Sequence, residues 1–384
     1  MSSKEFLIFS GSNPRAIVAF CRELERLGQS IYIIARTRQD FIFKTKYRRY
    51  VLATRRIESL DIEDLHRCIT KSRQKSGVSR FIICPTSEYF NTFALEHHSF
   101  FASLDCEVAL VNRAVYQTVS NKSSCSALCQ EYGIEIPQRV EADQVAPPIV
   151  AKPLVNINAQ GKSLYPYLID DEVKLAQFHA SENLADFYFE EYIIGPSFYL
   201  LFYLARDGNV YKFSQKNIAQ QANGKSMVMV QSDQLHETAV ADQFVAILQA
   251  IGFYGLVMID LMKQLETGRF VFIEMNPRFW GPSQLMVDAH SNILAAFIGD
   301  HLFDNSDRFA QSTPQKARYL WFGGCLANAA RGESLKWHIL RPRWTAIFIL
   351  RQLVNDIYLR CDTMSLFGYE LYTAGKNLFW KRKK

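Results

Sequence analysis

Residues 255–284 read GLVMIDLMKQLETGRFVFIEMNPRFWGPSQ, and this stretch decides how the chain is interpreted. Apolar runs at 255–262 and 270–275 are separated by a short polar segment that ends at Gly268, so they predict two strands joined by a turn. Because residues two apart on a strand point to the same face, Glu274 and Asn276 project together. If the two strands pair through the turn, the Asp260 side chain can lie beside those of Glu274 and Asn276.

This group of side chains has the chemistry of a metal site. Carboxylate and amide oxygens from Asp260, Glu274 and Asn276 are hard ligands that suit Mg²⁺ carrying a nucleotide polyphosphate. Arg278 follows two residues later, where it can meet phosphate oxygens. The alternative is an ordinary hairpin with polar strand ends. Burying unpaired carboxylates on apolar strands is costly, which disfavours that alternative.

The first 112 residues predict a doubly wound α/β domain. Apolar runs that are typical of buried strands alternate with segments of helical period, and this alternation favours a parallel sheet. The expected strands are 5–11, 31–35, 80–85 and 107–111, and the expected helices are 14–27 and 61–76.

The remaining chain predicts a second, α+β unit and a distinct tail. A strand at 148–153, two strands within 187–213 that include a turn at Asp207-Gly208, and a helix at 239–251 mix hairpins with helices. The polar stretch 214–226 is expected to be a mobile loop, and 315–384 to be mainly helical. The predicted divisions are 1–112 (N-terminal α/β domain), 113–187 (linker helices and a small subdomain), 188–310 (metal and nucleotide subdomain) and 311–384 (helical, basic, aromatic region).

Composition favours a globular protein of the reducing cytoplasm. The 384 residues are 48% hydrophobic, no apolar run approaches a membrane span, and the N-terminus lacks the pattern of a signal peptide. The eight cysteines show no CxxC pair and no zinc spacing. The net charge of +6 lies in the tail, because eleven Lys/Arg face four Asp/Glu from Arg331 onward.

Several segments resemble the ATP-grasp superfamily of carboxylate ligases. IEMNPRFWG at 273–281 resembles the family's E-x-N-P-R-x-W-G metal segment. PIVAKP at 148–153 resembles its strand with a nucleotide-binding lysine, and FEEYIIGPSF at 189–198 resembles its hinge strand. The likeness covers about residues 1–300, so it implies an N-terminal α/β domain, an ATP-grasp fold and a helical C-terminal extension.

The resemblance also implies roles for individual residues. Two Mg²⁺ ions, or Mn²⁺ in their place, would be held by Asp260, Glu274 and Asn276. Arg278 and Lys152 would be catalytic. The nucleotide would be bound by Lys122 and Lys152 at the phosphates, by Glu190 or its neighbour Glu191 at the adenine amino group, by the backbone of Tyr192 and Ile193, and by Ser197 at the ribose.

Two features depart from the family pattern. Ser197 stands where the family usually has an acidic residue for the ribose, and a hydroxyl binds a ribose more weakly than a carboxylate does. The glycine-rich lid after the lysine strand is sparse, since NINAQGKS at 156–163 holds only Gly161. Both departures bear on nucleotide affinity.

The implied activity is an ADP-forming ligation that passes through an acyl phosphate. A small-molecule or glycan-linked carboxylate would attack the γ-phosphate of ATP, and an amine would then displace phosphate. A thiol acceptor or bicarbonate as the carboxylate stays open, as does the oligomeric state. Alternatives are a non-catalytic nucleotide-binding module and an adaptor at the inner face of the membrane that uses the basic residues 331–384. No nucleic acid partner is expected.

Two loops of the N-terminal domain are weaker candidates for substrate binding. Residues 11–15 (GSNPR) follow the first strand and open a helix, a position where backbone donors can hold an anion. Residues 85–88 (PTSE) follow a later strand at the edge where ligands gather in open α/β sheets. A tight turn and a helix cap are the structural alternatives.

Overall fold

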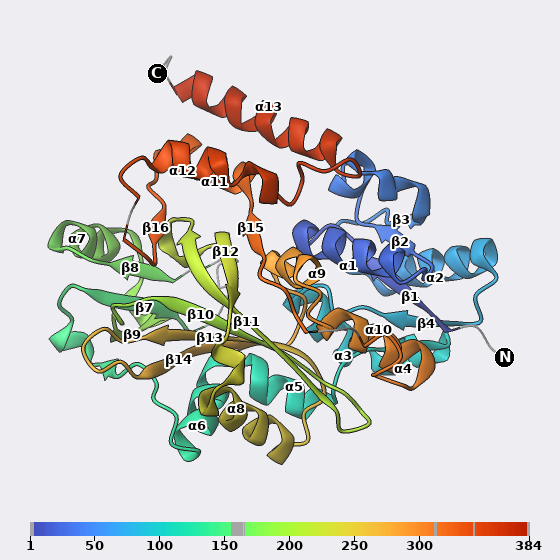
Figure 1. The fold of residues 1–384 in the computed structure, drawn as a ribbon, viewed down its shortest axis with the longest axis horizontal. Helices are drawn as coiled ribbons and strands as arrows, with labels where there is room; N and C mark the ends of the chain where they lie inside the picture. Colours follow the sequence, from blue (N-terminus) through green and yellow to red (C-terminus); the bar gives the residue numbers. More distant parts are fainter. Residues whose placement is uncertain (1–3, 155–163, 165, 311–312, 341, 382–384) are drawn as a thin grey trace.

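A computed structural model describes residues 4–154, 164, 166–310, 313–340 and 342–381 (Figure 1). The expected lid residues Gly161 and Lys162 therefore lie outside the described residues. In the described part of the chain, three sheets are present: a parallel sheet near the N-terminus, a small antiparallel sheet and a large antiparallel sheet. Among these residues, no helix is both long and apolar enough to cross a membrane.

The N-terminal sheet is parallel and covered by helices on both faces. Alternate strand residues enter two separate cores: Phe6 and Ile8 pack with helix α1, whereas Leu7 and Phe9 pack with helix α2. Burial on both faces explains why these strands are continuous apolar runs. The strand order is β3-β2-β1-β4-β5, and the elements are β1 (Lys4–Phe9), α1 (Pro14–Arg26), β2 (Tyr32–Ala35), β3 (Val51–Thr54), α2 (Ile62–Ser76), β4 (Arg80–Ile83), α3 (Glu88–Glu96), α4 (His98–Ser103) and β5 (Cys106–Val108).

The predicted doubly wound sheet is confirmed, with one addition. Strand β3 was not anticipated from the sequence, because it is short and only Ala53 of its four residues is buried. It pairs in parallel with β2 at the end of the sheet.

The small sheet carries the predicted lysine strand. Its order is β6-β9-β7-β8, and α7 packs on it around buried aromatic residues that include Phe178 and Phe187. Its elements are β6 (Arg139–Val140), β7 (Ile149–Pro153), β8 (Tyr167–Ile169), α7 (Glu172–Ser181) and β9 (Phe187–Glu191).

The large sheet has the order β14-β13-β10-β11-β12-β15, and β16 pairs with β11. The turn at Asp207-Gly208 joins β10 to β11 as predicted, and Gly208 has a φ of 91° there. The strands are β10 (Ser197–Leu204), β11 (Val210–Gln220), β12 (Met227–Asp233), β13 (Gly255–Lys263), β14 (Phe270–Asn276), β15 (Arg318–Leu320) and β16 (Lys336–Trp337).

The prediction of a mobile loop at 214–226 was wrong for its first half. β11 continues to Gln220, and Ser214, Gln215 and Asn217 are buried in the sheet. Most of their side-chain groups find partners: Gln215 Nε2 donates to Asn217 Oδ1 at 2.7 Å, and Asn217 Nδ2 donates to Ser197 Oγ at 2.7 Å. Gln215 Oε1 is buried without a hydrogen-bond partner among the described residues. Composition suggested a loop because these side chains are polar, but the tertiary structure supplies the partners that let them be buried.

Helices cover both faces of the large sheet. On one face lie α5 (Arg113–Ser120), α6 (Lys122–Glu131) and α8 (Ala239–Ala250), and on the other α9 (Gln284–Asp288) and α10 (Ile293–Phe303). The C-terminal helices are α11 (Phe322–Ala330), α12 (Thr345–Arg351) and α13 (Met364–Lys381), and α13 runs along one edge of the molecule (Figure 1). The tail is helical as expected, but β15 and β16 also tie it into the large sheet.

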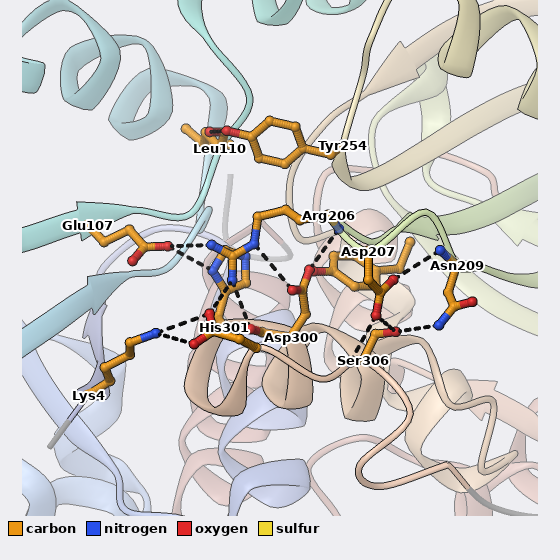
Figure 2. A network of polar contacts seen from close by, with 12 residues as sticks. Lys4, Glu107, Leu110, Arg206, Asp207, Asn209, Tyr254, Asp300, His301 and Ser306 are labelled. Atoms are coloured by element: carbon orange, nitrogen blue, oxygen red, sulfur yellow. Dashed lines mark hydrogen bonds and ion pairs between the residues drawn. The ribbon is translucent and has the colours of Figure 1, made fainter. Parts of the chain in front are cut away.

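A polar network, with Asp300 and His301 buried at its base, fixes the parallel sheet to the β10–β11 hairpin. Arg206 after β10 lies 3.2 Å from Glu107 of β5 and 3.2 Å from Asp300 of α10 (Figure 2). His301 Nδ1 lies 3.3 Å from Glu107, and Tyr203 donates to Asp300 at 2.5 Å. The network therefore sets how the N-terminal sheet sits against the large sheet.

Candidate active site

The predicted hairpin exists and brings the two carboxylates face to face. β13 and β14 are antiparallel, and Asp260 is the register partner of Glu274. A register shift follows directly after this pair, between Asp260 and Leu261. Gly268, with a φ of 70°, allows the turn that joins the strands.

Asp260 is held in an unfavourable electrostatic position. Burial and the charge of Glu274 raise the pKa of the Asp260 carboxyl well above its usual value. The Ser197 hydroxyl donates to Asp260 Oδ1 at 3.3 Å and partly offsets this effect. Lys336 and Lys152 also lower the pKa of Asp260, but it stays well above its usual value. Two facing carboxylates of this kind are an arrangement that a divalent cation would stabilise.

Asn276 and Arg278 extend the same cluster. Asn276 Nδ2 donates to Glu274 Oε1 at 2.8 Å, and Arg278 Nη2 donates to Asn276 Oδ1 at 3.1 Å. Glu274 and Asn276 therefore share a face, as the strand periodicity predicted. Among the described residues, no group of three or more His, Cys, Asp or Glu side chains could hold a metal ion, so an amide oxygen would have to complete a site here.

The carboxylates border a cavity of about 150 Å³ between the small and large sheets. We call it the inter-sheet cavity. Nine of the residues chosen from the sequence line it: Lys122, Lys152, Glu190, Glu191, Tyr192, Ile193, Ser197, Asp260 and Glu274. Asn276 and Arg278 are not among its lining residues and connect to it through Glu274. Wider clefts of about 930, 860 and 840 Å³ lie elsewhere on the molecule.

Lys152 and Glu190 meet on the small-sheet side of the cavity. β7 and β9 are antiparallel with Val150 opposite Glu190, which places Lys152 diagonally across from the carboxylate. Lys152 Nζ lies 2.5 Å from Glu190 Oε2. Glu190 is buried, whereas Glu191 is half-buried and accepts from the Gln138 backbone N–H at 3.2 Å.

The segment between β9 and β10 is held tightly against β13. Leu265 N donates to Ile194 O at 3.0 Å, and Lys263 N donates to Pro196 O at 2.9 Å. A Cβ on Gly195 would lie 1.8 Å from the Lys263 carbonyl oxygen, so this close approach requires glycine. The adjacent residues Tyr192 and Ile193 are thereby fixed at the cavity wall.

The C-terminal segment adds residues that the sequence analysis missed. Lys336 and His338 line the inter-sheet cavity, and Lys336 Nζ lies 4.9 Å from the Tyr192 ring centroid. His338 Nε2 lies 3.1 Å from Gln220 Oε1, and burial lowers the pKa of His338 to about 3, so its imidazole is neutral. Their spacing of two, in and directly after the short strand β16, was the one available signal, and it does not reveal which sheet that strand joins.

Arg15 and Ser87 of the loops at 11–15 and 85–88 have structural roles, and the helix cap at Ser87 is the anticipated alternative that the structure shows. Arg15 is buried, donates to Met227 O at 2.9 Å and stacks 4.0 Å above Trp321. Ser87 caps α3 by accepting from Phe90 N at 3.3 Å.

Both loops also contact the segment that follows the metal hairpin. Asn13 Nδ2 donates to Phe279 O at 2.8 Å, and Phe279 N donates to Pro85 O at 2.9 Å. The N-terminal sheet edge therefore adjoins Arg278.

Solved structures with similar folds agree with this architecture. A biotin carboxylase from Campylobacter jejuni in complex with an ATP analogue matches with a TM-score of 0.58 and 13% identity, covering 83% of this chain and 75% of that one. An L-amino acid ligase from Bacillus licheniformis matches with a TM-score of 0.54 and 16% identity, covering 79% and 75%. A pyruvate carboxylase from Rhizobium etli matches with a TM-score of 0.57 and 18% identity, covering 78% of this chain.

These matches show the ATP-grasp fold that the sequence motifs implied. The chain spans 28% of the pyruvate carboxylase chain, so it corresponds to one part of that enzyme. No protein-family model matches the sequence, and a sequence search of curated proteins finds no significant match.

Proposed function

We propose that this chain, which has the ATP-grasp fold, is an ATP- and Mg²⁺-dependent ligase that couples a carboxylate to an amine. The observation that carries the proposal is the pairing of Asp260 with Glu274 in the cavity that also holds Lys152 and Glu190. Three carboxylates and a half-buried lysine converge there from strands β7, β9, β13 and β14, next to the segment that links β9 to β10. A relative solved with an ATP analogue and one named as an amino acid ligase support the same activity.

In this proposal, the residues of the inter-sheet cavity bind ATP. Lys122 and Lys152 contact its phosphates, Glu190 and the backbone of Tyr192 and Ile193 bind the adenine, and Ser197 binds the ribose. A cavity of 150 Å³ is smaller than the range of about 300–1,000 Å³ that small-molecule sites occupy. ATP binding therefore requires the small sheet to move away from the large sheet.

Asp260, Glu274 and Asn276 would hold Mg²⁺, which when bound neutralises polyphosphate charge and polarises the γ-phosphoryl group. A substrate carboxylate oxygen attacks the γ-phosphorus, and ADP leaves with the electrons of the broken P–O bond. Arg278 stabilises the transferring group and the resulting acyl phosphate. The amine nitrogen then attacks the acyl carbon, phosphate leaves, and the nitrogen loses a proton.

The test is a turnover assay with purified protein, ATP, Mg²⁺ and pools of carboxylates and amines. We expect release of ADP and phosphate that depends on both pools, loss of this release in Glu274→Gln, and retention in Glu266→Gln. Glu266 is a matched control because it lies on the exposed turn of the same hairpin. Release of AMP and pyrophosphate would overturn the acyl-phosphate route. Binding of Mg·ATP without turnover in any pool would favour a nucleotide-binding module.

We also propose that the C-terminal region contacts an anionic membrane surface. Leu340, Trp344 and Val354 are 95%, 69% and 85% exposed on consecutive segments around α12. The described carboxylates of this region are turned away from solvent or paired. Asp356 and Asp362 are buried, Glu333 lies 2.7 Å from Arg331, and Glu370 accepts from Trp321.

This arrangement leaves Arg343 and Arg351 exposed beside the apolar side chains, a combination that suits anionic headgroups. Co-sedimentation with phosphatidylserine vesicles tests the proposal, with phosphatidylcholine vesicles for comparison. We expect Trp344→Ser to lose binding, and Leu265→Ser, an exposed leucine on the metal hairpin, to keep it. Equal sedimentation of both variants would contradict this.

A further inference from the structure

A second cavity, of about 140 Å³, lies at the carboxyl edge of the parallel sheet. We call it the edge cavity. The two arginines among its lining residues immediately follow neighbouring strands: Arg36 comes after β2, and Arg55 comes after β3. Ser12 and Thr86 line it from the loops after β1 and β4. Ligands of open α/β sheets gather outside the carboxyl ends of the strands, so this is a favourable place for a bound group.

The edge cavity has more positive than negative charge. Arg36 Nη2 lies 2.9 Å from Glu58 Oε1, but Glu58 is largely exposed. Arg55 Nη1 donates to the Ser59 carbonyl at 3.1 Å, and among the described residues it has no ion pair with a carboxylate. Burial, and to a lesser extent the charge of Arg36, lower the pKa of the Arg55 guanidinium, whereas Asp64 and Asp40 raise it.

An open basic groove of about 840 Å³ continues from the edge cavity, since Arg55 and Glu58 line both. Within the described ranges, Arg67 forms an ion pair with Asp64, and the other Lys and Arg side chains of the groove form no ion pair with a carboxylate. The other cations of the groove are Arg38, Arg48, Arg56, Lys71 and Lys75. Such a surface concentrates anions by its field and is costly in repulsion without them.

The wall of the edge cavity is hydrogen-bonded, through one side chain, to the segment next to Arg278. Asn13 Nδ2 donates both to Thr86 O, at 3.4 Å, and to Phe279 O, at 2.8 Å. Thr86 lines the edge cavity, and Phe279 directly follows Arg278. One side chain thus ties the wall of the cavity to the segment expected to contact the transferring phosphoryl group.

We propose that the edge cavity binds an anionic group of the ligase substrate between Arg36 and Arg55, and that the substrate carries further negative charges along the basic groove. This inference rests on the proposed function and names the substrate class: a multiply anionic molecule whose reacting end lies near Arg278. A single water needs about 10–15 Å³ of such space, so 140 Å³ accommodates a carboxylate or phosphate group.

Inorganic phosphate is the probe for the edge cavity. The protein is first saturated with Mg²⁺ and a non-hydrolysable ATP analogue, which fills the γ-phosphate position, and phosphate is then titrated calorimetrically. We expect Arg55→Gln to weaken phosphate binding by about tenfold or more, because a charge-assisted hydrogen bond is lost. Glu58→Gln should strengthen it, since Arg36 loses its competing partner. Arg113→Gln, which removes an exposed arginine paired with Glu96, is the matched control.

Each variant is also titrated with the nucleotide analogue alone, and we expect that affinity to be unchanged. This titration distinguishes a wrong inference about the edge cavity from a wrong proposal of ATP-dependent ligase activity, because only the second predicts that the nucleotide analogue does not bind. Phosphate binding that is absent, or equal in wild type and Arg55→Gln, overturns the inference. If Arg55→Gln fails to fold, Glu58→Gln decides alone, and unchanged or weaker binding counts against the inference.

Hexaglutamate is the probe for the groove. We expect it to compete with phosphate, and we expect Lys71→Gln to weaken hexaglutamate binding without changing phosphate binding. A single-stranded oligonucleotide that occupies the groove without displacing phosphate would instead make the groove a nucleic acid surface. That result would overturn the extended part of the inference.

Discussion

Lys152 and Glu190 form an ion pair at the wall of the inter-sheet cavity, with 2.5 Å between Lys152 Nζ and Glu190 Oε2. Both side chains are also the expected nucleotide contacts from the small sheet. The pair therefore links the stability of this sheet to nucleotide binding. A bound nucleotide would contact the same two side chains, so it would either weaken their ion pair or add to it.

A double-mutant cycle tests this link. Removing one partner of a buried pair leaves an uncompensated charge, so we expect Lys152→Met and Glu190→Gln each to lower the free energy of unfolding by about 3 kcal/mol. The double variant should lose less than the sum. Urea denaturation measures these values, and strictly additive losses would show that the pair is not coupled. Lys152→Met should also bind Mg·ADP at least about tenfold more weakly.

Asp260→Asn should stabilise the metal-free protein. Burial beside Glu274 raises the pKa of Asp260, so the ionised carboxylate disfavours folding above its usual pKa. The amide removes that penalty, and we expect a gain of about 1 kcal/mol or more in the presence of EDTA. The same variant should lose the stabilisation that Mg·ADP gives to the wild type. Thermal unfolding with and without Mg·ADP measures both effects, and destabilisation in EDTA would refute the electrostatic argument.

Gly195→Ala should disturb the segment between β9 and β10, which carries the expected adenine contacts Tyr192 and Ile193. A Cβ there would lie 1.8 Å from the Lys263 carbonyl oxygen, and backbone atoms cannot move aside without breaking the contacts at 194–196. We expect nucleotide affinity to fall about tenfold or more, measured by calorimetry. Gly375→Ala is the control, because its Cβ meets nothing within 4 Å in α13 and should add up to about 1 kcal/mol of helix stability. Normal nucleotide binding by Gly195→Ala would contradict the expectation.

Glu370→Gln should stabilise the protein increasingly with pH. Burial raises the pKa of Glu370 to about 7, whereas an unfolded glutamate has a pKa of about 4.3. The folded state thus holds the proton more tightly, and stability falls as pH rises from about 4.3 to about 7. The neutral amide avoids this loss, so its advantage should be about 2 kcal/mol larger at pH 8 than at pH 5. Urea denaturation at both pH values measures it, with the exposed Glu131→Gln as the control. An advantage independent of pH would rule out this cause.

The sequence by itself determined most strands of the parallel sheet, the β13–β14 hairpin and many of the residues that line the inter-sheet cavity. Continuous apolar runs predicted the parallel strands, since burial on both faces demands them. The period of two placed Glu274 beside Asn276, and the turn at Gly268 brought Asp260 opposite Glu274. These are local features, for which spacing along the chain fixes geometry in space.

Only the tertiary structure decided which distant segments complete the cavities. Lys336 and His338 reach the inter-sheet cavity because β16 pairs with β11, more than a hundred residues earlier in the chain. Arg36 and Arg55 meet because β2 and β3 are neighbours in the parallel sheet. The polar residues Ser214, Gln215 and Asn217 are buried in a strand, which their composition did not predict, because partners such as Ser197 come from another strand. Strand order and side-chain partners depend on packing between remote segments, and no local pattern records that packing.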